Sequence, residues 1–368
     1  MKNFISPLLK WYFFNKREFP WRTEIYSHRS QWVYHTWICE VMSQQTLISV
    51  VLPKFKQFVE ELPSLEQLAT CSDEKLRSLW SGLGYYARAR NLRNGAIYIL
   101  NECHGEFPTT QQEWLKVPGC GEYTSSIIAS ICFQEYVPAI DGNVIRVASR
   151  LLGLTEHVWD KIGQRNISDF MKQVFQIFSK METTNGLPGD LNQAFMDFGS
   201  MICKKQKPLC LECPIQQSCV AFEKQITEIC PPIKPRREVQ QEDIFAFALV
   251  NQKNKSCLLV ERESGFLRKT LGFPLYAKKD GHSLNSLLNK ISHSQIKVRT
   301  SESTFQHSIT HHKITGYLTI LESDWDEKTT SQFYSSMSLP EKKHWIPLPH
   351  LKNQLSSSLD LKVLKLLS

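Results

Sequence analysis

The chain has 368 residues, 42% of them hydrophobic, which is enough to bury two cores, and we expect two domains. Its formal net charge of +8 at pH 7 permits nucleic-acid binding but does not require it, because a local basic patch matters more than the total. The sequence has no apolar run of the about 18 residues that a membrane span needs and no signal-peptide pattern at its start, so we expect a cytoplasmic protein with no membrane partner.

The first informative segment, residues 31–49, has apolar residues at helical spacing, and we expect one helix over this range. Successive side chains on a helix are rotated by about 100°, which places Glu40 on the same face as Val33, Trp37 and Val41. A carboxylate on an apolar face is either paired with a cation or kept protonated by desolvation. The sequence therefore leaves two interpretations of Glu40 in balance, a general acid or a structural glutamate paired with an arginine.

Residues 115–121 lie between two predicted helices and contain the pattern L-x-V-P-G-x-G. Pro118 ends the first helix, and Gly119 and Gly121 allow a tight turn in which a phosphate can approach the backbone N–H groups of the next helix. This is the pattern of a helix-hairpin-helix that binds DNA independently of sequence, although an ordinary helix–helix turn would also explain it. Tyr123 stands just inside the second helix.

Asp141 precedes another predicted helix. Its default interpretation is a helix N-cap or a turn residue, because Asp-Gly is a common turn signal. The functional alternative is a carboxylate that opposes Glu40. Glycosidic bonds break through an oxocarbenium-like state flanked by two carboxyl groups, one protonated and one ionised.

The chain has eleven cysteines, which are unevenly distributed. Four lie close together with the spacing C-x6-C-x2-C-x5-C: Cys203, Cys210, Cys213 and Cys219. One dense cluster among scattered thiols favours a reducing compartment and a metal site over a disulfide framework. The spacing alone does not choose between zinc and an iron–sulfur cluster. Lys204, Lys205 and Lys207 in the first loop suit phosphate contact or form a solvated charged face.

The pattern changes after residue 229. Residues 230–241 begin with a proline-rich basic stretch that cannot continue a helix, and we expect a linker there. Beyond it, short β-rich runs at 244–250, 257–261 and 314–321 are followed by a predicted helix at 359–367. The sequence therefore predicts a mainly α domain over residues 1–229 and an α+β domain over residues 242–368.

Together these motifs resemble the endonuclease III and MutY superfamily of base-excision DNA glycosylases over nearly all of residues 1–229. The matching blocks are FPWR at 19–22, WICEVMSQQT at 37–46, GLGYYARARN at 82–91, the hairpin, DGN at 141–143 and LNQA at 191–194. The resemblance implies a helix-hairpin-helix glycosylase domain with a [4Fe–4S] cluster on the four cysteines at 203–219. Tyr123 stands where strand-cutting lyases have a lysine nucleophile, which favours the MutY branch.

The resemblance implies a monofunctional adenine DNA glycosylase. Such an enzyme hydrolyses the N-glycosidic bond of adenine that faces 8-oxoguanine or guanine in double-stranded DNA, and we expect it to act as a monomer associated with the nucleoid. Glu40 would protonate the leaving adenine at N7, and Asp141 would stabilise the sugar cation or capture it. Tyr123 and Asn143 would orient these two groups.

A second set of residues is implied to contact DNA or the extruded base: Gln44, Gln45, Tyr85, Gly119, Gly121, Gln193, Thr310 and His311. Gln45 and Tyr85 would wedge into the base stack as the target base leaves it, which offsets part of the cost of extrusion. Gln193 would read an edge of the adenine. Gly119 and Gly121 would hold the phosphate of the strand.

Residues 242–368 resemble, more weakly, the Nudix-like domain with which the family recognises 8-oxoguanine. The resemblance rests on residues 272–275 and on the segment that ends at His311. The family pattern there is Phe-Ser-His, whereas this chain has Ile309, Thr310 and His311. Thr310 keeps a hydroxyl where the family has serine, whereas Ile309 lacks the aromatic ring of the family's phenylalanine.

Two further departures matter. Asp280 is the only acidic residue in 276–291, where Nudix hydrolases hold magnesium on a glutamate-rich helix, so we expect no pyrophosphatase activity. Ser43 stands where the family commonly has leucine near the adenine pocket. With Ile309, Ser43 leaves open a glycosylase for another mismatch, such as thymine opposite guanine, or a lyase for oxidised pyrimidines. A non-catalytic damage-binding protein that uses only the hairpin and the cluster is the other alternative.

Overall fold

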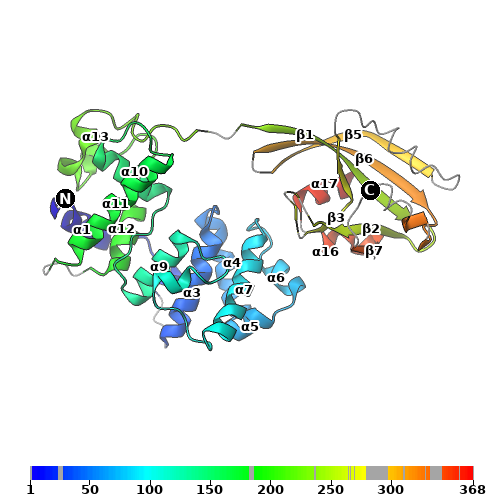
Figure 1. Ribbon diagram of the computed structural model, residues 1–368, viewed down its shortest axis with the longest axis horizontal. Coiled ribbons are helices and arrows are strands. Elements are labelled where there is room, and N and C mark those ends of the chain that lie inside the picture. The colour runs from blue at the N-terminus through cyan, green and yellow to red at the C-terminus, as the bar shows by residue number, and fades with distance from the viewer. Residues whose placement is uncertain are drawn as a thin grey trace. The chain divides into compact units, whose positions relative to one another are not determined.

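The structure is a computed structural model, and it describes residues 2–23, 28–181, 186–235, 238–263, 265, 267–268, 270–278, 297–309, 311–327, 329–331, 342–355 and 357–367. The chain divides into two compact units, Met1–Pro235 and Arg236–Ser368 (Figure 1). In the described part of the chain, no helix is both long and apolar enough to cross a membrane. Each unit is described separately below.

The first unit is helical, as the spacing of its apolar residues predicts. Its helices are α1 (Lys2–Asn15), α2 (Pro20–Thr23), α3 (Arg29–Ser43), α4 (Ile48–Glu61), α5 (Leu65–Thr70), α6 (Asp73–Leu79), α7 (Ala87–Glu102), α8 (Gln111–Trp114), α9 (Glu122–Phe133), α10 (Gly142–Leu152), α11 (Lys161–Phe178), α12 (Pro188–Met201) and α13 (Val220–Glu223). Two short 3-10 helices, η1 (Cys210–Glu212) and η2 (Gln216–Ser218), precede α13.

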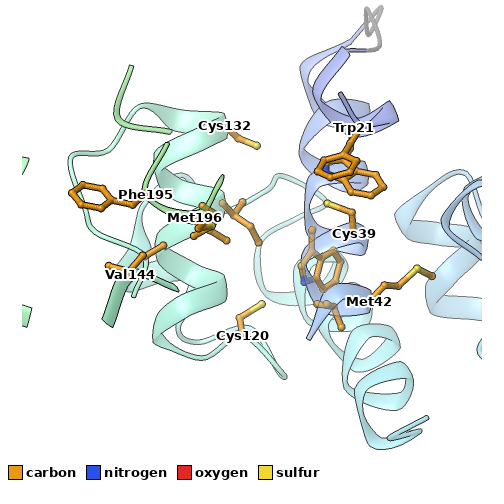
Figure 2. Close-up of a cluster of buried hydrophobic side chains, with 14 of the residues drawn as sticks. Trp21, Cys39, Met42, Cys120, Cys132, Val144, Phe195 and Met196 are labelled. Atoms are coloured by element: carbon orange, nitrogen blue, oxygen red, sulfur yellow. The ribbon is translucent and has the colours of Figure 1, made fainter. Parts of the chain in front are cut away.

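One hydrophobic core holds the helices of this unit together. Trp37, Trp80 and Trp114 are among its largest fully buried side chains. Figure 2 shows the core passing from α3, where Cys39 and Met42 lie, towards α9, α10 and α12. Helix α3 contacts α4, α7 and α9, so a side chain near its C-terminal end is surrounded by helices from several parts of the chain.

The single helix that we predicted over residues 31–49 is wrong at its C-terminal end. Helix α3 ends at Ser43, and α4 begins at Ile48. Gln45 in the intervening turn has a φ of 54°, in the left-handed region, which interrupts the helical path. Apolar periodicity continues across this turn because both helices bury residues in the same core, so spacing alone could not reveal the break.

The two units meet within the predicted linker at 230–241, but that stretch is structured at both ends. Cys230 is 1% exposed, and its carbonyl accepts a 2.8 Å hydrogen bond from Nε of Arg150 on α10. Trp159 donates to the carbonyl of Pro232 at 2.8 Å. The first strand of the second unit begins at Gln240. The connection between the units is therefore shorter than the predicted stretch.

The second unit is built on a mixed β-sheet. Its elements are β1 (Gln240–Asn251), β2 (Ser256–Glu261), β3 (Leu271–Gly272), β4 (Leu275–Ala277), β5 (Lys297–Ile309), β6 (His312–Ser323), β7 (Lys343–Pro347), η3 (Leu348–His350), α16 (Leu351–Gln354) and α17 (Ser358–Leu367). The predicted strands at 244–250, 257–261 and 314–321 and the final helix are confirmed.

The described strands pair in the order β3-β2-β1-β6-β5, with β4 on β1 and β7 on β2. The β1–β6 pair is parallel, and the other pairs are antiparallel. Alternate residues of β1 face opposite sides: Ile244, Ala246 and Ala248 pack with α16 and α17, whereas Phe245 and Phe247 join a second cluster with Trp325. Helices α16 and α17 therefore cover one face of the sheet (Figure 1).

Candidate active site

The two predicted carboxylates meet in one cleft of the first unit, with a volume of about 660 Å³. Of the predicted site residues, seven line this cleft: Glu40, Gln44, Gln45, Gly119, Gly121, Tyr123 and Asp141. Ser43 also lines it. Glu40 comes from α3, the glycines and Tyr123 from the hairpin and α9, and Asp141 from the start of α10. Residues far apart in the sequence thus converge on a single concave surface.

The fold changes the pKa of Glu40, one of the acidic residues that line this cleft. Desolvation by burial raises the pKa of Glu40 from 4.5 to about 7. A hydrogen bond from the Tyr123 hydroxyl to Oε2, 3.0 Å long, and the charge of Arg22 lower this pKa, whereas the charge of Asp141 raises it. Burial outweighs the two stabilising partners, so Glu40 exchanges its proton near neutral pH.

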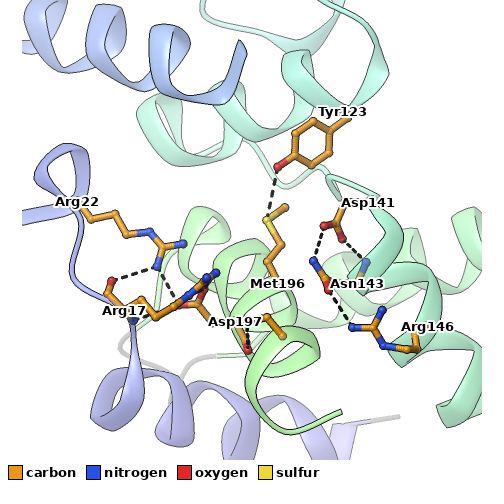
Figure 3. A network of polar contacts seen from close by, with 9 residues as sticks. Arg17, Arg22, Tyr123, Asp141, Asn143, Arg146, Met196 and Asp197 are labelled. Atoms are coloured by element: carbon orange, nitrogen blue, oxygen red, sulfur yellow. Dashed lines mark hydrogen bonds and ion pairs between the residues drawn. The ribbon is translucent and has the colours of Figure 1, made fainter. Parts of the chain in front are cut away.

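Tyr123 connects Glu40 to α12. Its hydroxyl lies 3.0 Å from Oε2 of Glu40. The same hydroxyl lies 3.6 Å from the sulfur of Met196 on α12 (Figure 3). Burial and the neighbouring charge of Glu40 raise the pKa of Tyr123 well above its usual value, so its phenol keeps its proton. A protonated phenol donates its hydrogen bond to the carboxylate of Glu40 and fixes the orientation of that group.

Asp141 has the default role that the sequence indicated, and it also lies in the cleft that Glu40 lines. It is the N-cap of α10, and Oδ1 accepts hydrogen bonds from the backbone N–H groups of Asn143 and Val144 at 2.9 and 2.8 Å. Its other oxygen accepts from the side-chain amide of Asn143 at 2.7 Å, and that amide oxygen accepts from Arg146 (Figure 3). These three hydrogen bonds hold the carboxyl group of Asp141 in one orientation beside the cleft.

Sequence analysis did not identify a buried ion cluster next to this cleft. Asp197 on α12 is fully buried and accepts hydrogen bonds from Arg17 at 2.6 Å and from Arg22 at 2.8 Å (Figure 3). Burial alone would raise the pKa of Asp197, but the two guanidinium groups outweigh it and hold that pKa below its usual value. Arg22 also acts on Glu40 through its charge. The sequence signal for Arg22 was the FPWR block at 19–22, which matched the family but to which we assigned no role.

The two glycines of the hairpin have different structural reasons. Gly119 has a φ of 88°, and a Cβ atom there would lie 2.8 Å from Cβ of Asn91, so both conformation and space require glycine. Gly121 is the N-cap of α9 with a φ of −89°, which any residue can adopt. A Cβ atom on Gly121 would meet open space, so glycine here leaves the N-terminus of α9 accessible from the cleft.

Three predicted DNA contacts lie elsewhere in the described structure. Gln193 is 9% exposed, its amide donates to the carbonyl of Gly189 within α12, and it is not among the residues that line the cleft. Tyr85 is 56% exposed in the turn before α7. His311 lies in the turn between β5 and β6 of the second unit. Thr310 and Asp280 lie outside the described residues.

The four clustered cysteines line one cavity beside α10. Arg150 on α10 is 2% exposed and donates to Sγ of Cys203 at 3.3 Å and to the carbonyl of Lys204 at 2.7 Å. In the ranges that the structure describes, no three acidic, histidine or cysteine side chains are grouped as a single metal ion would require. Thiolates of cysteine are the ligands of zinc sites and of iron–sulfur clusters.

The helical fold with its hairpin, and the cleft beside that hairpin, are features that comparison with known protein families can place. Residues 38–170 match the family model described as HhH-GPD superfamily base excision DNA repair protein. The chain is 30% identical over 277 residues to an adenine DNA glycosylase of Buchnera aphidicola subsp. Schizaphis graminum, which covers 75% of this chain and 76% of that protein. This chain belongs to the adenine DNA glycosylase family.

One further sequence relative and one solved structure show how far the similarity extends. The adenine DNA glycosylase of Rattus norvegicus is 37% identical over 220 residues, which is 59% of this chain and 41% of that protein. The chain thus spans about two fifths of the length of the mammalian relatives. The solved structure of a thermostable thymine-DNA glycosylase is similar in fold, with a TM-score of 0.52 and 23% identity over 61% of this chain and 96% of that one.

Proposed function

We propose that this protein hydrolyses the N-glycosidic bond of adenine mispaired with 8-oxoguanine or guanine, acting as a monomer on double-stranded DNA. The observation that carries the proposal is the placement of Glu40 and Asp141 in one cleft of about 660 Å³. Membership of the adenine DNA glycosylase family supports adenine as the base that is removed. The hairpin glycines that line the same cleft support a DNA strand beside it.

Glu40 is the general acid of the proposed reaction. A carboxyl group with a pKa near 7 is about half protonated at neutral pH, which is the optimum for proton transfer under those conditions. Glu40 donates this proton to N7 of the adenine in the cleft, which turns the base into a better leaving group. The hydroxyl of Tyr123 then stabilises the carboxylate that remains.

Asp141 stabilises the deoxyribose as the bond to adenine breaks. The sugar passes through an oxocarbenium-like state, and a fixed anion beside it lowers the energy of that state. Because three donors already hold Asp141, little reorganisation is needed during the reaction. Water then attacks the sugar, and Glu40 in its ionised form accepts a proton from that water.

Strand cleavage is not part of the proposed activity. A bifunctional glycosylase needs an amine that forms a Schiff base with the sugar. The residue at the hairpin's second helix is Tyr123, and its phenol is committed to Glu40. A phenol cannot form an imine, so the product is an abasic site in an intact strand.

A single-turnover excision assay with Glu40→Gln tests the proposal. The wild type should release adenine from an adenine–8-oxoguanine duplex, and the variant should be slower by about 100-fold or more, because glutamine cannot supply the proton. DNA binding should be nearly unchanged. Glu60→Gln, at an exposed position on α4, is the matched control and should keep the wild-type rate.

Two outcomes would contradict the proposal. An unchanged rate in Glu40→Gln would make Glu40 a structural residue and favour a binding protein. Faster release of thymine opposite guanine than of adenine opposite 8-oxoguanine would assign the protein to a different mismatch. The same assay on an adenine–guanine duplex measures the preference for the oxidised partner.

Two finer features belong to the same proposal. Cys203, Cys210, Cys213 and Cys219 would hold a [4Fe–4S] cluster, which would cross-link the loop between α12 and α13; their common cavity supports this assignment. The second unit would be a Nudix-like module that contacts the 8-oxoguanine through the turn between β5 and β6. Its mixed sheet and the helices α16 and α17 on one face support that resemblance.

A further inference from the structure

Two turns of the first unit, the first of which lines the cleft, hold non-glycine residues in the left-handed conformation. Gln45, between α3 and α4, has a φ of 54°, and Tyr85, just before α7, has a φ of 46°. Both side chains are exposed. This region of backbone space is sparsely populated by non-glycine residues, and such conformations persist when surrounding contacts hold them in place.

One side chain supplies contacts to both turns. Arg88, the second residue of α7, directs Nη1 at the end of α3, where it donates to the carbonyls of Val41 and Met42 at 3.0 Å and to that of Gln44 at 2.5 Å. These are carbonyls that the end of a helix leaves without partners inside the helix. A positive charge at this end is also favoured by the helix dipole.

The other terminal nitrogen of Arg88 serves the second turn. Nη2 donates to the carbonyl of Leu83 at 2.8 Å and to that of Gly84 at 3.3 Å. It also reaches back to Oγ1 of Thr46 in the first turn at 3.2 Å. The guanidinium therefore connects the backbone of residues 41–46 with that of residues 83–84.

The guanidinium of Arg88 also packs against two aromatic rings at the second turn. It lies over the rings of Trp80 and Tyr85, at 5.6 and 5.8 Å from their centroids. Trp80 is fully buried and donates to the carbonyl of Gly84 at 3.1 Å, so it anchors this arrangement to the core. The exposed ring of Tyr85 thus has a fixed support on the side of Arg88.

We propose that Arg88 is a positioning residue that joins the Gln45 turn and the Tyr85 turn into one rigid unit, so that both side chains enter the DNA stack together. This proposal rests on the proposed function and on the role that the family resemblance implies for Gln45 and Tyr85, which is to wedge into the base stack. The planar fork of arginine provides several donors in a fixed geometry, whereas lysine has a single point charge. Lysine at position 88 would keep the positive charge but could not hydrogen-bond both turns at once.

Hydrogen exchange in the free protein tests the connection without reference to catalysis. In Arg88→Lys, the amides of residues 44–47 and 82–86 should both exchange about 10-fold faster or more, because local opening of the two turns is coupled through one side chain. Arg93→Lys is the matched control: Arg93 is also on α7 and binds the carbonyl of Cys71 and Asp73, but it contacts neither turn. Faster exchange in only one turn, or in neither, would overturn the proposal.

Excision rates test the consequence for DNA. Single-turnover release of adenine opposite 8-oxoguanine should be slower by about 10- to 100-fold in Arg88→Lys, because small misplacements of positioning groups have effects of this size. The rate should recover towards wild type when the adenine faces an abasic site, where extrusion costs less. A merely structural role would slow both duplexes equally, and that result would contradict the proposal.

A third comparison separates this proposal from the proposed function. If the wild type releases no adenine, the proposed function fails, while the exchange data still decide whether Arg88 joins the two turns. If the wild type is active and Arg88→Lys retains its rate on the adenine–8-oxoguanine duplex, only the positioning role fails. Combining Arg88→Lys with Gln45→Ala should add little to either single loss, since both act on the same step.

Discussion

Four influences act on the single carboxyl group of Glu40. Burial is the largest and raises its pKa, the hydrogen bond from Tyr123 and the charge of Arg22 lower it, and the charge of Asp141 raises it again to a net value of about 7. The proposed reaction needs the protonated form. The excision rate should therefore be highest on the acidic side and should fall as the pH rises through about 7.

Replacing Tyr123 changes this pH dependence in a defined direction. Tyr123→Phe removes a donor that stabilises the carboxylate of Glu40, so the pKa should rise and the fall in rate should move to higher pH, by on the order of one pH unit. Single-turnover rates over a pH series measure the midpoint. Tyr98→Phe, on α7 and outside the cleft, should leave the midpoint in place. A midpoint that stays fixed or moves down in Tyr123→Phe would show that this hydrogen bond does not control Glu40.

Sequence reasoning reached the two carboxylates and, through the resemblance, Tyr123 and Asn143, but it gave no role to the arginines around them. Glu40 was found because a charge on an apolar helix face is unusual, and Asp141 because Asp-Gly precedes a helix. Arg22 and Arg88 were missed because their partners, Asp197 and the carbonyls at the end of α3, lie in distant parts of the chain. Local spacing carries no information about such partners.

Elements with a strong periodic signal were predicted more successfully than those defined by their neighbours. The β1, β2 and β6 strands are apolar and buried, and their type could be inferred from composition. Strand β5 has the sequence KVRTSESTFQHSI, and among the described strands it stands at one end of the order and pairs only with β6. Its pairing with β6, rather than its own sequence, makes it a strand.

The loop that carries the four cysteines has little regular structure of its own. Between α12 and α13 the described elements are η1 and η2, each only three residues long. Arg150 holds one side of the loop through Lys204 and Cys203. A group bound by all four thiolates would add cross-links that the backbone hydrogen bonds do not provide, so its binding energy would contribute to folding.

Removing one ligand of that group should therefore cost both iron and stability. Cys213→Ser should lose most of the bound iron and the visible charge-transfer absorbance, and its melting temperature should fall by about 5–10 °C. Cys103→Ser, which changes a partly buried thiol outside the loop, should keep the iron. Stoichiometric zinc, or equal iron in both variants and the wild type, would refute the [4Fe–4S] assignment. The measurements are metal analysis and thermal unfolding under anaerobic conditions.

At the scale of the whole molecule, the two units divide the proposed work. Every group that we assign to bond cleavage lies in Met1–Pro235, and the turn assigned to the oxidised base lies in Arg236–Ser368. Each unit has its own core, so each can be altered without repacking the other. Changes in the second unit should therefore affect the choice of mispair more than the chemistry of excision.

His311 provides the test of this division. It lies in the turn between β5 and β6, its carbonyl accepts a 2.9 Å hydrogen bond from the backbone of Gln240, and its ring packs 4.2 Å from that of His312. If its side chain contacts the oxidised base, His311→Ala should reduce the preference for adenine opposite 8-oxoguanine over adenine opposite guanine by about 5-fold, the value of one hydrogen bond. The rate on the adenine–guanine duplex should stay at the wild-type level.

The control for this experiment is His350→Ala, an exposed histidine in η3 of the same unit that makes no side-chain cap contact. Neither substitution lies within a strand of the sheet, so we expect both variants to fold. Thermal unfolding of each variant measures any general loss of stability. An equal fall on the two duplexes in His311→Ala would place the residue in general DNA binding. An unchanged preference would move recognition of the oxidised base away from this turn, because a contact specific to 8-oxoguanine must change the ratio of the two rates.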